Sequence, residues 1–80
     1  MVRPEDVKRY IEEGLNCDQV AVEGDGHHFE ALIVSDEFDG KTRVQRHQLV
    51  YRALGERMKE EIHALSMKTL TPREWRAARG

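Results

Sequence analysis

A stretch with helical periodicity, residues 41–60, separates two runs of strand-forming residues, and this limits the fold more than any other feature. One stripe of side chains recurs at steps of three and four: Val44, His47, Tyr51, Leu54 and Met58. The stripe predicts a single helix from Lys41 to about Glu60. The flanking runs, Phe29–Ser35 and Ile62–Lys68, read as strands. A connection this long is too long for a hairpin, so we expect a right-handed crossover that makes the two strands parallel.

The residues before this unit predict a helix followed by a hairpin. Pro4 suits a first helical turn, and apolar residues then recur every four positions at Val7, Ile11 and Leu15, with Gly14 at the end. Gln19–Glu23 alternates as a strand does, and Gly24-Asp25-Gly26 forms a turn before Phe29–Ser35. Because Phe29–Ser35 is apolar on both sides, we expect it at the centre of its sheet.

The residues after the third predicted strand predict a last helix. Thr71 can cap it, Pro72 suits its first position, and Glu74 can complete a capping box ahead of Trp75. The predicted order is α-β-β-α-β-α, which makes an α+β fold with a three-stranded mixed sheet and helices on one face. At 80 residues, we expect a single domain over residues 1–80.

Charge and composition exclude several classes of protein. The net charge is −2 and the pI is about 6.1, which gives no support for a dedicated nucleic-acid binder. The single cysteine, Cys17, cannot form an internal disulfide. The longest apolar run is only Ala31–Val34, and the N-terminus is polar. We therefore expect no membrane span and no signal peptide, and a cytoplasmic location.

The parallel strands predict where three of the histidines lie. His27 and His28 precede one strand and His63 begins the other, so they should meet at the same edge of the sheet. Neutral imidazole binds iron, zinc and copper. Two histidines leave a metal short of ligands, and the chain has no CxxC or HExxH motif. Any metal or cluster there would need further ligands from a partner.

The histidines and Cys17 also have purely structural interpretations. His63 is in phase with Leu65 and Met67, so it also reads as a partly buried histidine at the edge of the core. His27 and His28 also read as solvated residues of a polar turn. His47, on the helical stripe, reads as packed and hydrogen-bonded rather than as a ligand. Cys17 reads as a small residue of a connection, since nothing is placed to activate its thiol.

A basic cluster marks the start of the predicted long helix. Lys41, Arg43 and Arg46 could bind phosphate or an acidic partner, and an ordinary solvated face is the alternative. Positive charge at a helix N-terminus opposes the helix dipole, which hints at a use other than stability. No nucleophile–base pair or carboxylate pair emerges from the spacing, so we expect no enzyme activity.

Two segments of the chain resemble the BolA family. Phe38–Tyr51 (FDGKTRVQRHQLVY) resembles the central motif of the family, and Ile62–Ser66 (IHALS) with Thr69–Trp75 (TLTPREW) resembles its C-terminal half. The short turn GDGHHF, residues 24–29, is similar to that of the compact bacterial members. The resemblance covers nearly the whole chain and implies a class II KH-like fold.

The resemblance also implies a function. Members bind a monothiol glutaredoxin and share a bridging [2Fe–2S] cluster with it and with glutathione. His63 matches the C-terminal histidine ligand of the family. The second ligand is a cysteine or histidine in the loop before the second strand; the loop-cysteine position holds Asp25 here, so His27 or His28 would substitute, with His27 favoured.

An alternative role implied by the family is DNA-binding transcriptional regulation in the stress response, through the KH-like face with Lys41, Arg43 and Arg46. Against it, the GxxG loop of KH domains is incomplete, because Arg43 stands where the second glycine would be. A weak homodimer is a further expectation.

Overall fold

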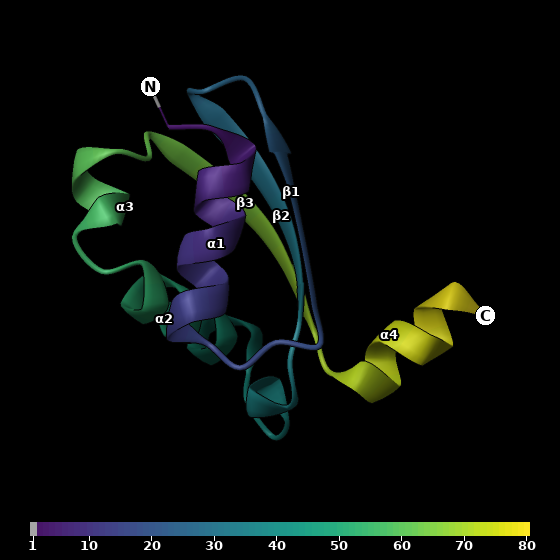
Figure 1. Cartoon of the computed structure of the whole chain (residues 1–80). Helices are drawn as coiled ribbons and strands as arrows, with labels where there is room; N and C mark the ends of the chain where they lie inside the picture. Colours follow the sequence, from purple (N-terminus) through teal and green to yellow (C-terminus); the bar gives the residue numbers. More distant parts are fainter. Residues whose placement is uncertain (1) are drawn as a thin grey trace.

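The computed structural model describes residues 2–80 and contains a three-stranded sheet with four α-helices and one short 3₁₀-helix in that range (Figure 1). In chain order the elements are α1 (Pro4–Gly14), β1 (Gln19–Gly24), β2 (His28–Val34), η1 (Asp36–Phe38), α2 (Arg43–Leu54), α3 (Arg57–Glu60), β3 (Ala64–Leu70) and α4 (Pro72–Arg79).

The sheet has the predicted mixed topology. Its order is β1-β2-β3, with β1 antiparallel and β3 parallel to the central strand β2. The register pairs His28 with Ala64 at one end and Val34 with Leu70 at the other. The α+β fold and the crossover between parallel strands are therefore confirmed.

One face of the sheet packs against α1 and α2 and holds the hydrophobic core. Phe29 and Ile33 of β2 are fully buried there, together with Ile11 of α1 and Val50 of α2. Phe38 of η1 is also fully buried and belongs to the same cluster. Side chains of a strand alternate between faces, so residues 28, 30, 32 and 34 point to the opposite side.

The prediction of a single helix over residues 41–60 is wrong. It is two helices, α2 and α3, separated by Gly55, whose φ of +59° is a left-handed conformation that interrupts the helix. The predicted stripe also changes: Val44 is 65% exposed and Tyr51 41% exposed, while Val50 and Leu54 are buried. Periodicity alone did not reveal which side of α2 meets the sheet.

The third strand begins two residues later than predicted. The backbone N–H of Ile62 donates to the carbonyl of Arg57, which extends the turn after α3 and keeps residues 62–63 out of the ladder. The first residue of the ladder is Ala64, whose N–H donates to the carbonyl of His27.

The last helix is capped as predicted but lies apart from the other helices. Thr71 Oγ1 accepts from the N–H of Glu74, and the Glu74 carboxylate accepts from the N–H of Thr71. α4 projects from the end of β3, away from α1 and α2 (Figure 1). The expectation that the helices lie on one face of the sheet therefore holds for α1 and α2 but not for α4. No helix within residues 2–80 has the length and apolar character needed to cross a membrane.

Candidate functional site

The starts of β2 and β3 bring two histidines together at one rim of the sheet. His27 directly precedes β2 and His63 directly precedes β3. Their ring centroids lie 5.4 Å apart with an angle of 36° between the planes, and both residues are exposed. The predicted convergence of residues 36 positions apart is confirmed for this pair. Since His63 is exposed, the reading of it as a partly buried core histidine is wrong.

Asp25 fixes the turn that presents His27. Its Oδ1 accepts hydrogen bonds of 2.9 Å from the backbone N–H groups of both His27 and His28. These backbone hydrogen bonds lower the pKa of Asp25, so the carboxylate stays ionised in the turn. Gly26, with a φ of +98°, completes the tight reversal of the chain.

His28 points to a different part of the molecule. It is the first residue of β2, and its side chain lies on the face of the sheet opposite the core. Its Nε2 lies 3.3 Å from Ser66 Oγ of β3. Of the two histidines of the turn, His27 is therefore the one whose ring lies beside His63.

The segment that carries His63 is tied to α1 by contacts that the sequence did not reveal. The hydroxyl of Tyr10 donates to Glu61 at 3.2 Å, and the guanidinium of Arg57 lies 4.0 Å from the centre of the Tyr10 ring. Ile62, which directly precedes His63, is buried in the core. These contacts hold α3 and the start of β3 against α1.

A shallow hollow of about 510 Å³ adjoins the histidine pair and is acidic. Asp6, Glu60 and Glu61 line it together with His27 and His63. Within residues 2–80 no group of three or more His, Cys, Asp or Glu side chains is arranged to hold a metal ion. The rim offers two imidazoles beside these carboxylates, of which Asp6 is already paired with Arg3 and Arg9, and further ligands would have to come from another molecule.

The imidazole pair has a spacing that suits one metal. A ring nitrogen bound at about 2.0–2.1 Å places its ring centre about 3.2 Å from the metal, so two such rings at a tetrahedral angle have centres about 5.2 Å apart. The observed 5.4 Å is close to this value. The donor set thus fits a metal centre that accepts nitrogen ligands and is completed from outside the chain.

Only part of the basic cluster is available to bind another molecule. Arg46 is bound inside the molecule: it donates to the carbonyls of Lys41 and Thr69 and to both carboxylate oxygens of Glu74, and its side chain is 14% exposed. Lys41 and Arg43 are exposed. A hollow of about 650 Å³ is lined by these three residues, with Lys68 and His47.

Two further residues behave largely as structural groups. His47 is half-buried on α2, as its packed reading predicts, and burial followed by the charge of Arg43 lowers its pKa. The hydrogen bond predicted for His47 is not seen: its Nε2 atom is buried and has no hydrogen-bond partner within the described chain. Burial, reinforced by nearby carboxylates, raises the pKa of the Cys17 thiol to about 11, which makes it a poor nucleophile.

Comparisons with known proteins agree with this fold. The family profile described as "BolA-like protein" matches residues 11–74. The acid stress protein IbaG of Escherichia coli is 39% identical over 71 residues, covering 88% of this chain and 84% of that protein. The DNA-binding transcriptional regulator BolA of Haemophilus influenzae is 44% identical over 54 residues, covering 68% of this chain and 52% of that protein.

A solved structure, the bolA protein homologue from Coxiella burnetii, superposes with a TM-score of 0.89 at 52% identity, covering 95% of this chain and 99% of that one. The profile match, the sequence identity and the shared fold all lead to one assignment. The chain belongs to the BolA-like protein family.

Proposed function

We propose that this protein is a non-catalytic adaptor that binds a monothiol glutaredoxin and shares a bridging [2Fe–2S] cluster with it. One observation carries the proposal: His27 and His63 form an exposed imidazole pair with a ring separation of 5.4 Å. The pair supplies two ligands to a centre that needs more. The partner and its glutathione would supply the thiolates.

The protein's own residues would bind and orient the cluster rather than react. His27 and His63 would hold it through neutral imidazole nitrogens, Asp25 fixes the backbone of His27, and the contact between Tyr10 and Glu61 steadies the segment of His63. A [2Fe–2S] centre with two histidine ligands carries electrons at a higher potential than one held by four thiolates. Such a shared site suits cluster transfer or iron and redox sensing in the cytoplasm.

Reconstitution with a glutaredoxin tests the proposal. The protein, a monothiol glutaredoxin, iron, sulfide and glutathione are mixed without oxygen, and the complex is isolated by size exclusion. We expect a 1:1 complex whose visible circular dichroism differs from that of the glutaredoxin cluster alone. His63→Ala should restore the glutaredoxin-only spectrum. A spectrum that His63→Ala leaves unchanged would show that His63 is no ligand.

The second candidate is nucleic-acid binding, favoured by the hollow that Lys41, Arg43 and Lys68 line. Arg46 contributes less than predicted, because Glu74 already neutralises it. A relative from Haemophilus influenzae carries the name of a DNA-binding transcriptional regulator. Duplex DNA binding should then weaken steeply with salt. If Lys41→Ala/Arg43→Ala binds DNA as the parent does, this role is excluded.

A further inference from the structure

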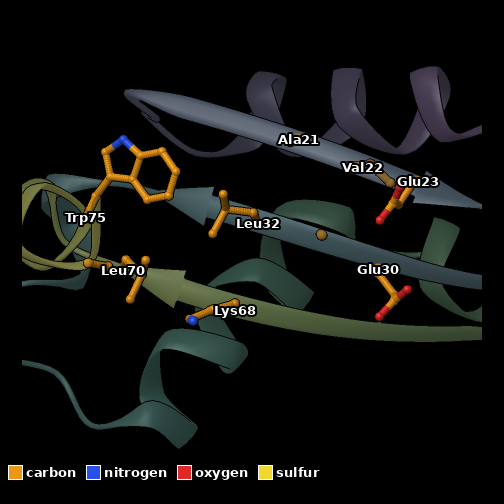
Figure 2. Close-up of a pocket in the computed structure, with 10 residues that line it drawn as sticks. Ala21, Val22, Glu23, Glu30, Leu32, Lys68, Leu70 and Trp75 are labelled. Carbon is orange, nitrogen blue, oxygen red and sulfur yellow. The ribbon is translucent and has the colours of Figure 1, made fainter. Parts of the chain in front are cut away.

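β3 is an edge strand whose outer backbone groups are unpaired. It pairs with β2 on one side, and no strand of the described chain lies on its other side (Figure 2). The N–H of Ala64 donates to the carbonyl of His27, so the even-numbered residues of β3 bond to β2. The N–H and C=O groups of Leu65 and Met67 therefore point away from β2, where residues 2–80 offer them no hydrogen-bond partner.

Arg46 closes one end of this edge. Its guanidinium donates to the carbonyl of Thr69 at 3.1 Å, and the carboxylate of Glu74 holds the guanidinium in place. The outer groups of Leu65 and Met67 have no such cap. The unpaired backbone therefore runs from Leu65 to the N–H of Thr69, which is long enough to pair with a short strand. We call this stretch the free edge.

One side of α2 lies beside the free edge. His47 lines the same hollow as Met67 and Thr69. Val44 and Tyr51 share the helical stripe of His47, and they are the large apolar residues that the described range leaves exposed, by 65% and 41%. The Nε2 atom of His47 is buried without a hydrogen-bond partner in the same range. α2 thus presents apolar surface and an unused polar atom next to an unpaired strand.

The surroundings of the free edge are basic. Lys41 and Arg43, at the N-terminal end of α2, line the hollow together with Lys68 of β3, and none of the three forms an ion pair within residues 2–80. Arg46 and Glu74 also line it but are paired with each other. The unpaired charge favours an acidic partner. It disfavours a second copy of the chain, because lysine on an edge strand opposes pairing between like edges.

We propose that an extended, acidic segment of a partner protein adds to β3 as a fourth strand of the sheet. Its backbone pairs with the free N–H and C=O groups of Leu65 and Met67. Because strand side chains alternate, one set lies on the core side, beside Val44 and His47, and the other lies beside Lys68 on the opposite face. The occupant is therefore a segment in which apolar and acidic residues alternate.

Duplex DNA is the competing occupant of the basic hollow, and the strand backbone distinguishes the two. DNA would contact the cations through its phosphates but would leave the N–H and C=O groups of Leu65 and Met67 unpaired. An added strand uses both the charges and the backbone. The free edge does not include His27 or His63, so this proposal can fail while cluster binding holds, and the reverse is equally true.

A designed peptide tests the proposal on the full-length protein labelled with ¹⁵N. The peptide has about seven residues, in which valine alternates with glutamate, and it is added at up to about 1 mM. It should slow amide hydrogen exchange at Leu65 and Met67. Ser66 and Lys68 should change little, because their N–H groups already bond to β2. This alternation is the signature of a strand added to the edge.

Two control peptides separate the backbone contacts from the charges. A peptide of the same length that alternates valine with lysine should not bind, because its charges repel Lys68, Lys41 and Arg43. The glutamate peptide with every backbone N–H methylated keeps its side chains but has no donors for the free edge, so it should not bind either.

Variants of the chain locate the contact. Lys68→Glu should weaken binding of the glutamate peptide at least about tenfold and create affinity for the lysine peptide. Lys59→Glu makes the same charge change on α3, away from the free edge, and should bind as the parent does. Met67→Pro removes an outward N–H that the ladder to β2 does not use, and should also weaken binding. If this variant does not fold, the methylated peptide tests the same hydrogen bonds.

Several results would overturn the proposal. One is the absence of any exchange or chemical-shift change in β3 over the whole peptide range. Another is protection that extends equally over consecutive residues, or a methylated peptide that binds as the unmodified one does. Binding of duplex DNA but not of the glutamate peptide would assign the hollow to nucleic acid. Protection of Leu65 and Met67 that rises with protein concentration alone would assign the free edge to a second copy.

Discussion

The guanidinium of Arg46 and the carboxylate of Glu74 join α2 to α4 through two hydrogen bonds of 2.7 and 3.3 Å, across 28 residues of sequence. Arg46 also donates to the carbonyl oxygens of Lys41, at 3.0 Å, and of Thr69, at 3.1 Å. One side chain thus connects the start of α2, the end of β3 and α4, which lies apart from α1 and α2.

Arg46→Ala should therefore destabilise the protein. It removes the donor to the Thr69 carbonyl and leaves the Glu74 carboxylate with only the N–H of Thr71 as a partner. We expect a loss of about 1–3 kcal/mol in the free energy of unfolding, measured by urea denaturation. Arg52→Ala, on the same helix but exposed, should change it by less than about 0.5 kcal/mol. Equal effects of the two variants would mean that the contacts of Arg46 contribute nothing specific.

The same pair predicts a pH dependence. Hydrogen bonds from Arg46 lower the pKa of Glu74 from 4.5 to about 2. Because the folded-state pKa lies below the unfolded one, the contribution of this carboxylate is complete above about pH 4.5 and is lost as the pH falls toward 2. The stability difference between the parent and Glu74→Gln should shrink over this window. A difference that stays constant would contradict an ionic origin.

The order of the elements and the parallel pairing of β2 with β3 could be predicted from the sequence. The connection between these two strands is too long for a hairpin, which leaves a crossover. The sequence also predicted the convergence at the rim, since parallel strands start at the same edge. It could not show the break at Gly55, whose positive φ leaves no trace in periodicity. The partnership of Arg46 with Glu74 was missed because it depends on where α4 lies, which no local pattern determines.

Gly14 is required for the contact between α1 and α2. A Cβ built on it would lie 2.8 Å from the Cα, Cβ and O atoms of Ala53, and this glycine does not have a positive φ. Gly14→Ala should therefore cost about 1–3 kcal/mol by overpacking, measured by thermal unfolding. Adding Ala53→Gly removes one of the three clashes and should recover part of the loss. A stabilised Gly14→Ala variant would show that the helices can move apart freely.

Asp25 should control how well the rim is ordered. Asp25→Ala removes the acceptor for the N–H groups of His27 and His28. Amide hydrogen exchange at both positions should accelerate, because the two N–H groups lose the acceptor that protects them. Asp25→Asn keeps an acceptor oxygen and should retain most of the protection. If Asp25→Asn behaves like Asp25→Ala, the charge and not the hydrogen bonds holds the turn.

The identity of the ligands is the central claim, and nitrogen hyperfine coupling tests it most directly. The protein is labelled with ¹⁵N-histidine, assembled with unlabelled glutaredoxin, iron, sulfide and glutathione, and reduced for pulsed electron paramagnetic resonance. We predict strong coupling from two histidine nitrogens, one lost in His27→Ala and one lost in His63→Ala. His28→Ala should keep both couplings, because the ring of His28 lies beside Ser66. A reduced cluster without strong histidine coupling, or one whose coupling is lost in His28→Ala alone, would contradict the account.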